Sequence, residues 1–151
     1  MSDELEELWD TAIYKEVASG AFYSAAQSKT QDPGAQTLLG ELARDEGKHR
    51  RWLKKLREEG LPTRRRQLGE LPNLKLSDYL TGADTIEGAG LQDTLIFALK
   101  REQQALEFYT GMMSLMRDEA AKRLCLRLVN EELRHKLKLE LLYDDLFYRE
   151  D

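Results

Sequence analysis

Residues 45–49 read Asp-Glu-Gly-Lys-His, and residues 131–135 read Glu-Glu-Leu-Arg-His. Both segments contain Glu-x-x-His, and the second follows the first by 86 positions. The chain has two histidines, and both fall in this motif. Residues three positions apart share one face of a helix, so the Glu and the His of each motif would point the same way. The repeat predicts two copies of one helical unit, each with a pair of ionisable side chains.

A second pair of matching segments has the same offset of 86 positions. Residues 16–23 and 102–109 each begin with Glu and end with Phe-Tyr. Glu16 lies seven residues, or two helical turns, before Tyr23 on an apolar stripe, and Glu102 has the same place in its own copy. Both carboxylates are therefore predicted to point into the protein core.

Glycine and proline mark the ends of the predicted helices. Residues 60–90 hold five of the ten glycines and two of the three prolines, which are poor helix formers. This segment is long enough to travel the length of a bundle, so that the third helix would start at the end where the second began. No segment shows the alternating pattern of a strand. The sequence predicts an all-α four-helix bundle of two repeated hairpins joined by this crossover, with helices at about 3–30, 33–59, 91–117 and 119–147.

Length and composition narrow the class of protein. The 151 residues, 41% of them hydrophobic, suit a single domain over residues 1–151. A net charge of −5 argues against a protein that coats nucleic acid. No apolar run approaches the ~20 residues that cross a membrane, and the first residues are acidic where a signal peptide would be basic and then apolar, so a cytoplasmic protein without membrane contact is expected. The single Cys125 can form neither an internal disulfide nor a cysteine-rich zinc site.

Six ionisable side chains thus converge on one predicted core. Four buried carboxylates would repel one another and cost several kcal/mol each unless other charges balance them. Two divalent cations offset the four negative charges when the imidazoles are neutral. A carboxylate-rich set with one imidazole per ion suits iron or manganese. The sequence predicts a site for two metal ions with these ligands: Glu16, Glu46, His49, Glu102, Glu132 and His135.

At these residues the sequence resembles the ferritin-like superfamily, and most closely the minimal, single-domain rubrerythrin-like proteins. The resemblance extends from the first helix to the fourth. It implies that two iron ions bind per chain, with manganese or zinc as alternatives, and that two of the four carboxylates bridge them. It also implies that Asp45 supports His135, and Glu131 supports His49, through hydrogen bonds outside the ligand set.

The resemblance implies a di-iron oxidoreductase that reduces peroxide or dioxygen, with the metal ligands as the catalytic residues. One cysteine is too few for the paired Cys-x-x-Cys of a rubredoxin domain, so a separate protein would donate the electrons. Ala105 stands where peroxidase-type rubrerythrins have an additional Glu. Ferroxidase activity, iron handling and metal binding without turnover are therefore alternatives. A homodimer is expected because ferritin-like bundles generally pair.

Tyr23 and Tyr109 have two interpretations. The favoured interpretation is structural: the rings fill space, and the hydroxyl groups hydrogen-bond a ligand carboxylate from outside the ligand set. A direct part in redox chemistry is the alternative.

Overall fold

The computed structural model describes residues 3–59 and 90–148. This part of the chain contains four helices: α1 (Asp3–Lys29), α2 (Pro33–Glu58), α4 (Leu91–Leu115) and α5 (Glu119–Phe147). The predicted all-α class is confirmed, and the predicted helix ends agree with these bounds to within two residues. Apart from Gly90, which begins α4 as its N-cap, the predicted crossover at 60–90 lies outside the described residues.

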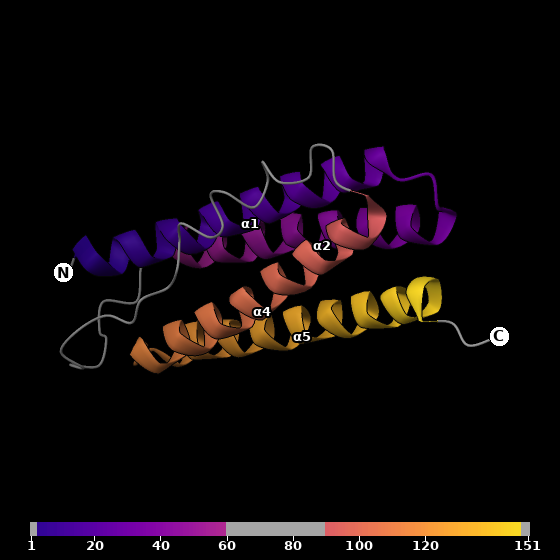
Figure 1. The fold of residues 1–151 in the computed structure, drawn as a ribbon. Helices are drawn as coiled ribbons and strands as arrows, with labels where there is room; N and C mark the ends of the chain where they lie inside the picture. The colour runs from indigo at the N-terminus through magenta and orange to yellow at the C-terminus, as the bar shows by residue number, and fades with distance from the viewer. Residues whose placement is uncertain (1–2, 60–89, 149–151) are drawn as a thin grey trace.

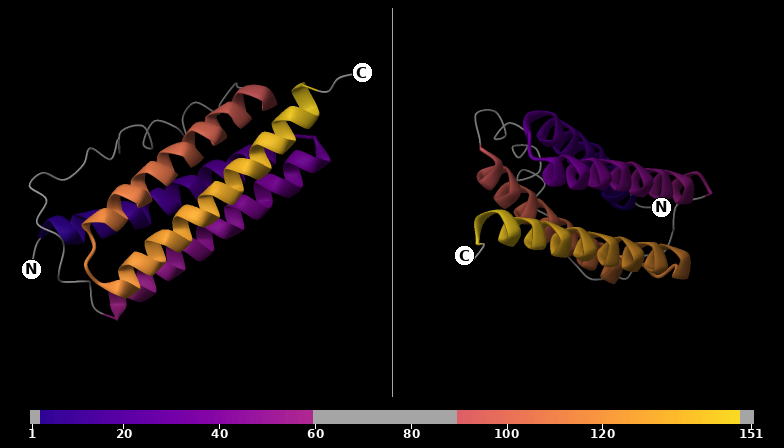
Figure 2. Two further views of the ribbon diagram at one scale, coloured as in Figure 1. Left: turned by 90° about the horizontal axis from the view of Figure 1, so that it is seen from below. Right: turned by 90° about the vertical axis from the view of Figure 1, so that its right-hand side faces the viewer.

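The helices form two hairpins that stack on each other. The first hairpin is α1 with α2 and the second is α4 with α5, while α2 packs on α5 and α1 on α4 between the hairpins. Figures 1 and 2 show the two hairpins as two layers. The starts of α2 and α4 lie at the same end of the bundle, as the length of the crossover predicted (Figure 1).

The second helix of each hairpin begins with the same cap. The carboxylate of Asp32 accepts a hydrogen bond from the amide of Ala35 at 2.8 Å, and that of Asp118 accepts one from Ala121 at 3.1 Å. Each bond satisfies an amide that has no partner within its helix. The two aspartates are 86 positions apart, so the repeat extends to the helix caps.

The end of α4 is where the structure departs most from the predicted bounds, by two residues. A helix to residue 117 was expected, but α4 ends at Leu115 because Met116 is extended, with φ −89° and ψ 143°. The side chain of Met116 is fully buried. An early turn into extended backbone places this methionine in the core and leads the chain directly to the cap of α5.

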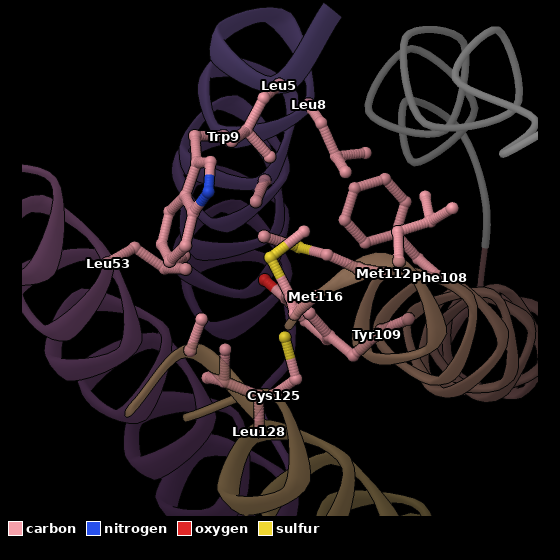
Figure 3. Packing of buried hydrophobic residues seen from close by; sticks show 14 residues of the cluster. Leu5, Leu8, Trp9, Leu53, Phe108, Tyr109, Met112, Met116, Cys125 and Leu128 are labelled. Carbon is pink, nitrogen blue, oxygen red and sulfur yellow. The ribbon is translucent and has the colours of Figure 1, made fainter. Parts of the chain in front are cut away.

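Two apolar clusters occupy the two halves of the bundle. Figure 3 shows the first, where side chains of all four helices meet. Its members include Leu8, Trp9, Leu53, Phe108, Met112, Cys125 and Leu128. The second cluster is built from Phe22, Tyr23, Ala26, Ala35, Leu39, Leu42, Leu95, Ala98 and Leu139. In every helix, the segment between the two clusters carries one or two of the predicted ligands. Within the described residues, no helix combines the length and the apolar character that crossing a membrane requires.

Candidate metal centre

The six predicted ligands lie together between the two apolar clusters. Each helix contributes one carboxylate, and α2 and α5 add a histidine each. All six side chains are buried, with exposed fractions of 2% or less. The inward orientation predicted from the helical spacing is therefore confirmed for Glu16, Glu46, His49, Glu102, Glu132 and His135.

The ligand atoms form two overlapping groups that could each hold a metal ion. One group unites Glu16 and His49 of the first hairpin with Glu46 and Glu132, and its ligand atoms all lie within 4.8 Å of one another. The other unites Glu102 and His135 of the second hairpin with the same Glu46 and Glu132. The two shared carboxylates lie between the groups, where bridging ligands of two ions would be.

Each histidine directs its Nδ1 atom into the cluster. The Nδ1 atom of His49 lies 3.3 Å from Glu46 and 3.5 Å from Glu16. The Nδ1 atom of His135 lies 3.0 Å from Glu132 and 3.5 Å from Glu102. The two imidazole rings are stacked, with centroids 5.7 Å apart. This arrangement places one inward imidazole nitrogen in each group of carboxylates.

The outward Nε2 atoms contact carboxylates of the opposite hairpin. His135 Nε2 lies 3.0 Å from an oxygen of Asp45, and His49 Nε2 lies 3.3 Å from an oxygen of Glu131. Both contacts are the ones that the family resemblance implied. A carboxylate at Nε2 favours a proton on that nitrogen, which leaves the lone pair of the neutral ring on Nδ1.

Two tyrosines cross between the hairpins to bond ligand carboxylates. The hydroxyl of Tyr23 donates to Glu102 at 2.5 Å, and the hydroxyl of Tyr109 donates to Glu16 at 2.6 Å. Both rings are buried. Burial first, and then the neighbouring carboxylates, raise the pKa of both phenols well above its usual value, so both hydroxyls stay protonated donors.

Each of the six candidate ligands has a buried polar atom that makes no well-aligned hydrogen bond within the described residues, although the two Nδ1 atoms lie at ion-pair distance from cluster carboxylates. Unsatisfied polar atoms are rare in protein interiors, because each costs about 1–3 kcal/mol, and more when charged. Six of them in one cluster are the donor set that a metal ion would complete. They are one carboxylate oxygen of Glu16, Glu46, Glu102 and Glu132 and the Nδ1 atom of His49 and His135.

The electrostatics of the centre reflect four carboxylates in a dry interior. Burial first, and then the neighbouring carboxylates, raise the pKa of Glu46 and Glu132 above the usual glutamate value. Burial opposes the charged form of His49, but the neighbouring carboxylates of Glu16 and Glu132 outweigh it and raise the pKa of His49 to about 9. Burial likewise opposes the charged form of His135, but the hydrogen bond to Asp45 and the nearby carboxylates of Glu102 and Glu132 raise its pKa. Without bound cations, the cluster therefore holds protons that metal binding would displace.

Two buried basic side chains near the centre were not predicted from the sequence. Lys15 and Arg101 are 86 positions apart, and each is only 3% exposed. The ammonium of Lys15 lies 3.5 Å from the centroid of the Phe108 ring, and the guanidinium of Arg101 lies 4.9 Å from that of Phe22. Each cation thus packs on an aromatic ring of the opposite hairpin, where cation–π contact is favourable.

The position of these cations gives them an electrostatic role. Each directly precedes a candidate ligand, Glu16 or Glu102, so the charge of Arg101, and that of Lys15 when it is protonated, offsets part of the negative charge of the centre. Burial lowers the pKa of Lys15 to about 6, with Arg101 adding to the effect and Glu16 opposing it. The shared offset was the signal in the sequence that could have revealed the pair.

Comparisons with known proteins support the fold and leave the function open. A scan against protein-family models and a search of curated proteins gave no match. Among solved structures, the chain is similar to a hypothetical protein from Pyrococcus furiosus. The two share 25% sequence identity with a TM-score of 0.70, over 93% of this chain and 88% of the other. This relative has no stated activity, so the functional argument depends on the geometry of the centre.

Proposed function

We propose that this protein binds two iron ions at the six buried ligands and reduces peroxide or dioxygen as a rubrerythrin-like, ferritin-like oxidoreductase. The observation that carries the proposal is the set of six unsatisfied ligand atoms, one on each candidate ligand. The six atoms lie between the two apolar clusters of the bundle. Four carboxylates and two imidazoles match iron or manganese better than softer metals.

The residues of the chain have distinct parts in this proposal. Glu46 and Glu132 would bridge the two ions, and the other four ligands would each bind one ion. Asp45 and Glu131 hold the imidazoles with Nδ1 facing inward. Two bound ferrous ions would supply the two electrons that reduce the O–O bond, and a separate donor protein would replace those electrons.

Ala105 supports ferroxidase activity or iron handling as a second candidate function. This residue is 5% exposed and belongs to an apolar cluster, so its position offers no further ligand atom. The additional Glu of peroxidase-type rubrerythrins therefore has no counterpart here. A symmetric set of four Glu and two His resembles a ferroxidase centre equally well.

The proposal is tested by loading the metal-free protein with ferrous iron under anaerobic conditions. We expect two ions per chain for the wild type and fewer for Glu102→Gln, which loses a charged ligand. The matched control is Glu107→Gln, an exposed glutamate on the same helix, and it should bind two ions. A Glu102→Gln variant that still binds two ions as tightly as the wild type would contradict the site.

The loaded protein then distinguishes the candidate functions. Peroxide or dioxygen is added, and the oxidation of ferrous to ferric iron is followed by near-ultraviolet absorbance. Fast oxidation that stops at two ions and reverses with a reductant supports the oxidoreductase. Continued oxidation of added ferrous iron supports the ferroxidase. A loaded protein that reacts with neither oxidant would leave metal binding without turnover.

A further inference from the structure

The outer side of the layer formed by α2 and α5 is strongly basic. Exposed lysine and arginine side chains form one row on each helix, and successive members of a row are three, four or seven residues apart. This spacing keeps each row on one side of its helix. Figure 2 (left) shows the two helices side by side on the near side of the bundle. We call this surface the basic face, and it consists of Arg44, Lys48, Arg51 and Lys55 of α2 and Arg123, Arg127, Arg134 and Lys138 of α5.

Few acidic side chains balance the basic face. Apart from the candidate ligands, the segments of α2 and α5 that carry the two rows contain two acidic residues, Asp45 and Glu131. The ammonium of Lys48 lies 3.2 Å from the carboxylate of Asp45. A guanidinium nitrogen of Arg134 lies 3.4 Å from that of Glu131. The basic face is therefore net positive, although the net charge of the whole chain is −5.

The basic face lies over the candidate metal centre. Asp45 and Glu131, which contact the outward nitrogens of the two histidines, have side chains that are 24% and 18% exposed. On the same face, the guanidinium of Arg127 lies 3.9 Å from the centroid of the Trp52 ring, across the boundary between α5 and α2. The Trp52 ring lies 5.2 Å, centroid to centroid, from the ring of His49. One aromatic side chain thus contacts both the basic face and a candidate ligand.

We propose that the basic face is the docking surface of an acidic electron-transfer protein, which delivers electrons to the centre over Trp52. This inference rests on the proposed function, in which a separate donor replaces the electrons spent on the O–O bond. At each of two encounters the donor would lose one electron, and one of the two bound ferric ions would gain it. Charge gathered on one face attracts and orients a partner of opposite charge, which suits the brief contacts of redox proteins.

Nucleic acid is another polyanion that a basic face could attract. A duplex extends beyond a face of this size, so it would also meet the surface that carries the excess acidic residues of the chain. A compact acidic protein would contact the basic face alone. The position of the face above the ligands also has a use for an electron donor and none for a nucleic acid.

The first test measures how fast reduced flavodoxin, a small acidic one-electron donor, reduces the oxidised, iron-loaded protein. Stopped-flow absorbance follows the loss of ferric iron under anaerobic conditions. Arg51→Glu should lower the second-order rate constant about 5- to 10-fold at low salt, because steering by opposite charge is weakened. Lys100→Glu is the matched control. It changes the net charge equally but is exposed on α4, outside the basic face, so its rate should stay within about 2-fold of the wild type.

Reduced methyl viologen separates the docking surface from the proposed function. This small cationic donor gains nothing from a basic surface, so it should reduce Arg51→Glu at least as fast as the wild type. If it reduces both, and flavodoxin reduces Arg51→Glu as fast as Lys100→Glu, the docking surface is wrong while the proposed function stands. Bound ferric iron that methyl viologen cannot reduce would contradict the proposed function and this inference with it.

The second test maps the contact on the metal-free protein. A carbodiimide joins lysine amines to carboxylates of flavodoxin that touch them, and mass spectrometry of the peptides identifies the lysines. Cross-links should form at Lys55 and Lys138, which are exposed on the basic face, and not at the exposed Lys100. High salt should abolish them, because it screens attraction between exposed charges. Equal cross-linking at Lys100, or a DNA duplex that displaces flavodoxin from the protein, would overturn the proposal.

Discussion

Each histidine of the candidate centre has its two ring nitrogens in different surroundings. The outward nitrogen of His135 contacts Asp45, and that of His49 contacts Glu131. The inward nitrogens face only carboxylates of the cluster. Because a neutral imidazole carries one proton, the outer carboxylates decide where it resides. Two side chains outside the ligand set thereby prepare two others to bind a cation.

Tyr109 offers a direct test of how much such support contributes. Tyr109→Phe removes the hydroxyl that donates to Glu16, so this ligand oxygen loses its hydrogen bond and its fixed orientation. We expect two metal ions still to bind, but with affinity about 10–100-fold lower, the usual effect of losing a residue that orients a ligand. Competition with a chromophoric chelator measures the affinity.

Tyr143→Phe is the matched control for this prediction. Its hydroxyl accepts a hydrogen bond from the exposed side chain of Gln92 and is remote from the ligands. The affinity of this variant should equal that of the wild type. A similar loss in both variants would mean that the tyrosines act through general stability and not through the ligand.

At the scale of the helices, the two capping aspartates should contribute similarly to folding. Asp32→Ala removes the cap of α2, and Asp118→Ala removes the cap of α5. Each substitution leaves an amide at the helix start without its partner, at a cost of about 1 kcal/mol in the free energy of unfolding. Urea unfolding monitored by circular dichroism measures this loss. Asparagine at either position should retain most of the stability, and an equal loss in the asparagine variants would exclude capping as the cause.

The helices and ligands were predictable because their signals are local. The spacing of three positions from Glu46 to His49 and of seven positions from Glu16 to Tyr23 is set within one helix, and both spacings recur 86 positions later. The burial of Lys15 and Arg101 has another origin. A residue next to an inward glutamate lies about 100° around the helix, at the edge of the buried face. Whether it is buried depends on aromatic rings of the other hairpin. The periodicity of a single helix does not show where those rings lie.

The end of α4 was unpredictable for a related reason. The residues up to 117 have adequate helix propensity, but Met116 has extended backbone and a fully buried side chain. Tertiary packing therefore overrides a local preference there. The exposure of several leucines on α5 could not be predicted from the sequence either. Only the packed bundle shows which side of α5 remains uncovered.

At the scale of the whole molecule, the bundle buries an excess of negative charge between two apolar clusters. The metal-free protein accommodates this charge by retaining protons and by keeping the basic side chains of Lys15 and Arg101 close to the ligands. Both arrangements have a cost, because ionised groups lose hydration on burial and the carboxylates compete for the same protons. The stability of the fold should therefore depend on pH in opposite ways with and without metal.

The pKa shifts give the direction of this dependence for the metal-free protein. Its folded state binds more protons than the unfolded chain at Glu46 and Glu132, whose pKa is raised, and at His49, whose pKa rises from 6.5 to about 9. The stabilisation from protonated His49 is present below pH 6.5 and is lost as the pH rises through about 9. Ionisation of the two glutamates acts in the same direction, since it adds buried negative charge. Lys15 acts in the opposite direction, because its pKa is lowered to about 6 and its unfolded form binds the extra proton. The raised groups outnumber it, so we expect the melting temperature of the metal-free protein to fall across this range.

Bound metal should reverse the effect, because the ions replace the protons and balance the carboxylates. The increase in melting temperature on metal loading should therefore grow between pH 6.5 and 9. Scanning calorimetry of metal-free and loaded protein at several pH values measures this increase. Loss of the metal-induced increase in Glu102→Gln, together with its retention in Glu107→Gln, would assign the effect to the six ligands. A metal-induced increase that is constant or shrinks with pH would show that metal binding does not displace protons from this centre.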